Sequence, residues 1–363
     1  MASQPHNPAP HDALSTTGGI AMITLTLAGW TSIPLFLRHF ASSIDAWTAN
    51  GWRYGISALI WLPVLFIASR SGTTPKGLWK AALVPSLFNI AAQICFALAP
   101  YLVEPGLMTF SMRLQIVFLT GGAALFFAAE RKVIRSPGFI VGMSLVILGT
   151  IGTLWLRPGG LGGGTALGVT LSIAAGLLYA GYALAVRHYM YGMRPIVAFA
   201  AVSQYTAGAI LALMFLLGTR GGMTALDLSG LQFFLLFLSA VIGIGLGHTL
   251  YFASIARLGL AVSAGVVQLQ PITVSIVSFF IFGERLTLGQ WSCGVAAIVG
   301  AGVMLYAQHR AAKRSRSRTP TAPEETPQLL CAQCGYNLEG LAEAIDCPKC
   351  GVPSTRRRTA SAR

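Results

Sequence analysis

Ten segments of the chain are each long and apolar enough to cross a lipid bilayer. They lie at 19–37, 47–68, 79–100, 105–128, 138–156, 164–186, 196–217, 231–253, 259–282 and 291–307. A membrane-spanning helix needs about 20 mainly apolar residues, and the lack of strict alternation favours helices over the strands of a barrel. Charged residues make up only 10% of the chain, against about 25% in a soluble domain. We therefore predict an all-α polytopic membrane protein with ten transmembrane helices.

The ten segments form two sets of five with related sequences. WTSIPLFLRHF at 30–40 corresponds to YAGYALAVRHY at 179–189, with Arg-His-aromatic at the same offset. Three further correspondences pair Trp52-Arg53-Tyr54 with Ser203-Gln204-Tyr205, Leu114-Gln115 with Leu269-Gln270, and Glu130 with Glu284. A unit with an odd number of spans must insert upside down relative to its copy, and inverted repeats underlie alternating access in many secondary transporters. We predict two inverted five-helix repeats, at 18–156 and 166–309, joined by a Gly-rich turn.

The charges outside the spans predict how the protein is oriented. Residues 1–17 contain no Lys or Arg, so they lack the basic region of a cleavable signal peptide, and we expect them to be disordered. Of the basic residues in the loops and in the run just after the last span, 14 fall on one predicted side: Arg70, Lys76, Lys80, Arg131, Lys132, Arg135, Arg187, Arg194, Arg257, Arg310, Lys313, Arg314, Arg316 and Arg318. The opposite side has Arg38, Arg157, Arg220 and Arg285. Because cytoplasmic loops are enriched in Lys and Arg, both termini are predicted to be cytoplasmic, in an inner or plasma membrane.

The basic residues after the last span begin a linker at 310–330. Such a run next to a membrane attracts anionic lipid. Because no aromatic residues interleave it, no nucleic-acid partner is expected.

Four cysteines near the C-terminus have the spacing of a metal site. Cys331, Cys334, Cys347 and Cys350 form two CxxC pairs separated by 12 residues. Two such pairs place four thiolates around one Zn²⁺, and CAQCGYNLEGL…CPKCG resembles a rubredoxin-like zinc ribbon. We predict a structural zinc ribbon at 331–351 followed by a basic tail at 352–363, with bound iron and redox-active thiols as the alternatives.

Two sequence stretches resemble a known transporter family. Residues 269–306, LQPITVSIVSFFIFGERLTLGQWSCGVAAIVGAGVMLY, and 114–152, LQIVFLTGGAALFFAAERKVIRSPGFIVGMSLVILGTIG, resemble the EamA-type modules of the drug/metabolite transporter superfamily. The first repeat departs from the pattern, because it has no proline where the second repeat has Pro271. The resemblance implies a ten-helix transporter of small metabolites with a central cavity between its halves. Glu130 and Glu284, at the helix ends, are expected to cap helices or form loop ion pairs.

Two arginines lie inside predicted spans. Arg113 is near the middle of the fourth span, where an ionised side chain costs several kcal/mol unless it faces a partner or a wet cavity; its counterpart is Gln268. Arg53, nearer the outer end of the second span, corresponds to Gln204. Because guanidinium binds carboxylate or phosphate through two parallel hydrogen bonds, both arginines are candidate substrate-binding residues and favour a substrate with an anionic group. The alternative is a structural arginine bonded to helix carbonyls.

Four further polar residues belong to the candidate site. His248 lies in the eighth span, opposite Gln93 in the first repeat, while Gln115 and Gln270 correspond to each other. A histidine titrates near physiological pH and can relay protons, although a neutral histidine bonded between helices is an equal alternative. Hydrogen bonding between helices is the simpler role for the glutamines.

The most consistent function is secondary transport of a small metabolite, with export as the expected direction. The alternative is a non-transporting membrane anchor or sensor whose zinc ribbon recruits a protein partner. The sequence contains no His, Asp and Glu cluster with catalytic spacing, so an enzyme is not expected.

Overall fold

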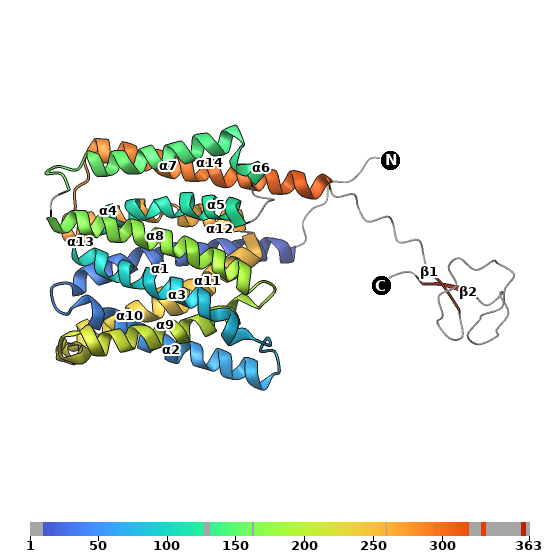
Figure 1. The fold of residues 1–363 in the computed structure, drawn as a ribbon, viewed down its shortest axis with the longest axis horizontal. Helices are drawn as coiled ribbons and strands as arrows, with labels where there is room; N and C mark the ends of the chain where they lie inside the picture. The colour runs from blue at the N-terminus through green and yellow to red at the C-terminus, as the bar shows by residue number, and fades with distance from the viewer. Residues whose placement is uncertain are drawn as a thin grey trace. The chain divides into compact units, whose positions relative to one another are not determined.

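A computed structural model of the chain describes residues 10–126, 131–161, 163–258, 260–318, 328–331 and 357–360. In this part of the chain, ten helices are long and apolar enough to cross a membrane, and they lie roughly parallel in a stacked bundle (Figure 1). The predicted number of spans is therefore confirmed, and the chain is a multi-pass membrane protein. Residues up to His309 form one compact unit, and residues from Arg310 form a second.

The first five spans contain one interrupted helix. The elements are α1 (Pro10–Phe40), α2 (Ala46–Arg70), α3 (Leu78–Leu98) with the short η1 (Ala99–Tyr101), α4 (Pro105–Ser111), η2 (Met112–Leu114), α5 (Gln115–Phe126), α6 (Arg131–Ile134) and α7 (Pro137–Trp155). The fourth span therefore consists of α4, the 3₁₀ segment η2 and α5. Helix α1 begins inside the segment 1–17 for which the sequence predicts disorder.

The second five spans contain two interrupted helices. The elements are α8 (Gly163–Tyr189), α9 (Pro195–Leu217), η4 (Thr219–Asp227), α10 (Gly230–Ala240), the π-helical η5 (Val241–Leu246), α11 (Gly247–Leu258), α12 (Leu260–Val267), α13 (Gln270–Phe282) and α14 (Leu288–Arg318). The eighth span consists of α10, η5 and α11. The ninth consists of α12 and α13, which are separated by a turn at Gln268 and Leu269.

Local sequence explains where several helices begin and end. Asp45 caps α2 by accepting a hydrogen bond from the backbone N–H of Thr48 at 2.9 Å. Ser229 and Gln232 form a reciprocal capping box at the start of α10, which satisfies N–H groups that have no partner inside the helix. Gly283 ends α13 in the left-handed conformation, with φ of 68°, which glycine adopts without steric cost.

Helices from the two halves pack against each other in matching pairs. Helix α3 packs on α8, and α11 packs on α1. Likewise α5 packs on α8, and α13 packs on α1, while α2 contacts α9 and α4 contacts α13. The buried side chains of Leu37, Phe40, Leu107 and Met108 belong to a core between these helices. The main helix contacts are therefore formed between the two halves and not within one half.

The second unit contains two short strands. Strand β1 (Gln328–Cys331) pairs antiparallel with β2 (Arg357–Ala360), and Cys331 lies opposite Arg357. These strands flank the predicted zinc ribbon. Cys334, Cys347 and Cys350 lie outside the described residues, and of Cys331 only the backbone is described.

Candidate functional site

Arg113 joins the two halves at the middle of the membrane domain. Its side chain is 8% exposed. Nη1 donates to Oε1 of Gln268 at 2.8 Å, and Nη2 donates to Oε1 of Gln270 at 3.2 Å. Gln270 in turn donates from Nε2 to the backbone oxygen of Trp30 at 2.8 Å. The structure therefore brings three predicted site residues together, and the guanidinium is held by neutral amides.

This contact lies where two corresponding helices are interrupted. Arg113 belongs to η2, between α4 and α5, and Gln268 belongs to the turn between α12 and α13. Pro271 at the start of α13 cannot donate a backbone hydrogen bond, which contributes to the second interruption. A short 3₁₀ segment inside a helix often marks a hinge, and transporters place binding sites at such discontinuities.

Arg53 has a different environment from Arg113. Its side chain is 2% exposed, yet Nε and Nη1 have no hydrogen-bond partner among the described residues. The corresponding Gln204 is bonded, because its Nε2 donates to the backbone oxygen of Ala58 on α2 at 3.0 Å. The two corresponding positions thus differ, with an unpaired charge in one half and a bonded amide in the other.

His248 lies in an aromatic environment. Its ring stacks on Phe199 with centroids 4.1 Å apart and meets the edge of Trp30 at 5.4 Å. Nδ1 has no partner among the described residues. Gln93, its counterpart, accepts a hydrogen bond at its backbone oxygen from Asn50 at 3.4 Å. Gln115 is half-buried on α5. The structure does not bring these residues into the Arg113 contact.

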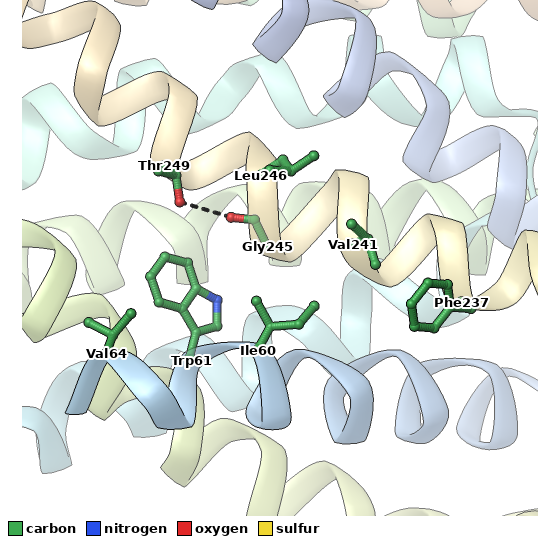
Figure 2. A pocket seen from close by; sticks show the side chains of 8 residues that line it. All are labelled: Ile60, Trp61, Val64, Phe237, Val241, Gly245, Leu246 and Thr249. Atoms are coloured by element: carbon green, nitrogen blue, oxygen red, sulfur yellow. Dashed lines mark hydrogen bonds between the residues drawn. The ribbon is translucent and has the colours of Figure 1, made fainter. Parts of the chain in front are cut away.

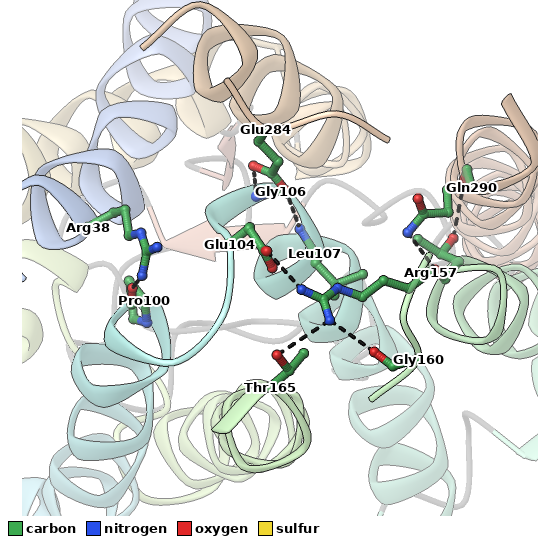
Figure 3. Close-up of polar contacts among 11 residues, drawn as sticks. Arg38, Pro100, Glu104, Gly106, Leu107, Arg157, Gly160, Thr165, Glu284 and Gln290 are labelled. Atoms are coloured by element: carbon green, nitrogen blue, oxygen red, sulfur yellow. Dashed lines mark hydrogen bonds and ion pairs between the residues drawn. The ribbon is translucent and has the colours of Figure 1, made fainter. Parts of the chain in front are cut away.

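Polar contacts gather at one end of the bundle (Figure 3). The carboxylate of Glu284, just after α13, accepts hydrogen bonds from the backbone N–H groups of Gly106 at 3.0 Å and Leu107 at 3.2 Å. Beside it, Arg157 pairs with Glu104 at 2.8 Å. Glu284 therefore caps a helix of the other half, and capping is one of the two roles that the sequence predicts for it. Burial raises the pKa of Glu284, although the two N–H groups oppose this rise.

A pocket of about 290 Å³ lies between α2 and the eighth span (Figure 2). Its wall contains Ile60, Trp61, Val64, Phe237, Val241, Gly245, Leu246 and Thr249. The lining is mainly apolar, and Leu246 and Phe237 are exposed. Thr249 donates to the backbone oxygen of Gly245 at 3.0 Å. The pocket therefore lies beside the π-helical segment, on the side that faces α2.

Comparisons with known proteins point to one transporter family. Residues 166–306 match the profile of the EamA-like transporter family, which is almost the whole second predicted repeat. A solved crystal structure, described only as that of a protein, shares 15% identity with a TM-score of 0.55, and the alignment covers 84% of this chain and 99% of that one. This similarity shows a shared fold. No curated protein matches the chain.

Proposed function

We propose that the chain is a secondary transporter that moves a small metabolite across the cytoplasmic membrane by alternating access. The observation that carries the proposal is the meeting of two interrupted helices, from corresponding positions in the two halves, at Arg113 and Gln268. A helix interrupted near the membrane centre can reorient one half against the other around a fixed site. The match of residues 166–306 to a transporter family supports the same conclusion.

The exchange of helix contacts between halves supports an inverted repeat. If the first five spans are superposed on the last five, the contact of α3 with α8 becomes that of α11 with α1, and the contacts α2–α9 and α4–α13 map onto themselves. A two-fold relation between the halves produces this pattern, and because each half has five spans the axis would lie in the membrane plane. The two halves are then equivalent rocking units, and this conformation is the one in which Glu284 ties α13 to α4.

Uptake into proteoliposomes tests transport directly. Purified protein is reconstituted in vesicles, which are incubated with a water-soluble metabolite extract of cells, and their contents are identified by mass spectrometry. We expect selective accumulation of one class of compound, and vesicles loaded with that compound report whether efflux, the proposed direction, also occurs. Empty vesicles are the control. Folded protein that moves nothing would favour the membrane-anchor alternative.

The C-terminal unit is proposed to hold one structural Zn²⁺ through Cys331, Cys334, Cys347 and Cys350. The pairing of β1 with β2 supports this proposal, because it brings the two ends of the cysteine segment together. Four thiolates leave no open coordination position, so the metal would stabilise the unit and take no part in transport. Reduced full-length protein should contain one zinc per chain, and Cys347→Ser with Cys350→Ser should remove it while uptake continues. A metal-free wild type would contradict the proposal.

A further inference from the structure

The ten spans contain buried positive charge without buried negative charge. Within the spans as the structure delimits them, no residue is Asp or Glu, whereas Arg53 and Arg113 are both buried. The carboxylate of Asp45, eight residues before Arg53, lies just before the start of α2 and accepts from the N–H groups of Thr48 and Thr219. Because an uncompensated charge in the membrane is costly, a negative charge supplied from outside the chain would be favoured here.

Within the described part of the chain, Arg53 has more hydrogen-bond donors without an acceptor than Arg113 has. Arg113 uses its three nitrogen atoms on Gln268, Gln270 and the backbone oxygen of Thr109. Arg53, by contrast, leaves Nε and Nη1 without an acceptor among the described residues. Nε shares one edge of the guanidinium plane with Nη2, and Nη1 shares the other edge with Nη2, so each edge contains one of these two donors. Either edge can bind a carboxylate or phosphate with two parallel hydrogen bonds.

Unpaired polar atoms continue along the same face of α2. Asn50 precedes Arg53 by three residues and Ser57 follows it by four, so all three lie on one side of the helix. Each is buried, and Asn50 Oδ1 and Ser57 Oγ have no partner among the described residues. The Ser57 hydroxyl can donate to an anion beside Arg53. Asn50 Oδ1 can only accept, so it suits a donor group on the same ligand.

The element opposite this face is the π-helical η5. A Cβ built on Gly243 would collide with the side chain of Ile33 and would lie 3.4 Å from Nη2 of Arg53, so the glycine lets η5 pack closely against both residues. Two residues further on, Gly245 faces Ile60 and lines the pocket of Figure 2. Segments of π-helix occur frequently at functional sites. The π-helical turn η5, with Gly243, therefore lies next to the unpaired Arg53.

Building on the transport function proposed above, we propose that Arg53, with Ser57, binds the anionic group of the transported molecule. The substrate class is a small metabolite that carries a carboxylate or phosphate and, next to it, a hydrogen-bond donor for Asn50. Hydroxy acids, amino acids and hydroxylated phosphate monoesters have this combination. Arg113 is then a structural contact between the halves and not the anion-binding residue.

This inference is tested by measuring uptake into proteoliposomes made of pure phosphatidylcholine. That lipid has no net charge, so no anionic headgroup competes with the substrate for Arg53. The probes are L-lactate, L-glutamate and glycerol phosphate, with methyl lactate and glycerol as uncharged counterparts, alongside the metabolite extract. Wild-type protein should move anionic compounds and not their uncharged counterparts. Arg53→Gln should raise the KM for the transported anion about 10–100-fold, as expected for loss of a charge-assisted contact, and Arg53→Lys should recover part of the loss.

Two controls separate binding from folding. Arg70→Gln changes an exposed arginine at the far end of the same helix and should leave KM unchanged. The thermal stability of Arg53→Gln should equal or exceed that of the wild type, because removing an unpaired buried charge removes a cost.

Three results would overturn the inference. The first is an Arg53→Gln variant with lowered stability and unchanged KM, which makes Arg53 structural. The second is accumulation of uncharged compounds alone, which refutes the anionic substrate and leaves the transport function standing. The third is no uptake of any compound by folded wild-type protein, which contradicts the transport function as well.

Discussion

The hydrogen bonds of Arg113 indicate a different role from the one that its position in the sequence suggests. Its depth in the membrane suggested a substrate-binding charge, but its hydrogen bonds go to Gln268 and Gln270. The position corresponding to Arg113 is Gln268 itself, so the two repeat-related residues contact each other. If the halves are related by the proposed two-fold axis, a residue near that axis meets its own counterpart, as in an isologous contact.

Exchanging the two residues tests that relationship. Arg113→Gln should lower the free energy of unfolding by about 1–2 kcal/mol, since hydrogen bonds between membrane helices contribute roughly 0.6 kcal/mol each and at most about 1.7. The double variant Arg113→Gln with Gln268→Arg should recover at least half of this loss, because the guanidinium is returned to the same contact from the other half. Stability is measured by thermal unfolding in detergent. A double variant less stable than both single variants would argue against the contact.

Glu284 predicts a pH dependence with a definite sign. Burial raises the pKa of this carboxyl above its usual value, so the folded state holds its proton more tightly than the unfolded state. Folded stability is then highest below the unfolded value of about 4.3 and falls as the pH rises through the folded pKa. Glu284→Gln should remove this part of the pH dependence. Melting temperatures of the two proteins between pH 4 and 8 should therefore diverge at low pH, with the wild type gaining relative to the variant.

At the scale of the elements, spans and their ends could be predicted from the sequence, whereas interruptions within them could not. Apolar length is a local property, so the ten helices follow from composition alone. The 3₁₀ turn at Met112–Leu114 follows no proline or glycine signal in its own sequence. Within this turn Arg113 bonds to a turn in another helix, and a contact with a residue 155 positions away in the sequence has no local signature. The reach of Glu284 to the start of α4 escaped prediction for the same reason.

The pairing of α7 with α14 depends on glycine at specific places. A Cβ built on Gly300 would lie 2.5 Å from the backbone oxygen of Gly142 and 2.9 Å from the backbone nitrogen of Val146. Backbone cannot move aside as a flexible side chain can, and small residues let membrane helices approach this closely. The close approach of α7 and α14 therefore requires glycine at positions such as Gly142 and Gly300.

Two alanine substitutions on α14 separate this effect from helix propensity. Gly300→Ala should destabilise the protein by about 1–3 kcal/mol through overpacking. Gly302→Ala, on the same helix, meets nothing within 4 Å and should be neutral or slightly stabilising. Thermal unfolding of both variants gives the comparison. Equal melting temperatures for the two variants would mean that α7 and α14 do not approach this closely.

At the scale of the whole molecule, the bundle has one polar, crosslinked end. Glu284, the Arg157–Glu104 pair and the bond from Arg38 to the backbone oxygen of Pro100 all lie at the loops where few basic residues occur. The basic loops, with Arg70, Lys76 and Arg194, lie at the other end. By the enrichment of Lys and Arg in cytoplasmic loops, the crosslinked end would face away from the cytoplasm. The described conformation would then be the one in which Glu284 joins the two halves on the outer side.

This orientation can be measured with reporter fusions. Reporters placed after residues 75, 192 and 312 should be active in the cytoplasm. These fusion points lie between the second and third spans, between the sixth and seventh spans and after the tenth span, all on the basic side. Reporters near 160 and 224 should report the opposite compartment, since those loops follow the fifth and seventh spans. The fusion at 160 is the most informative one, because it lies between the two repeats and an odd number of preceding spans is required for inversion. A cytoplasmic signal there would contradict the inverted relation of the halves and, with it, the alternating-access mechanism proposed for this chain.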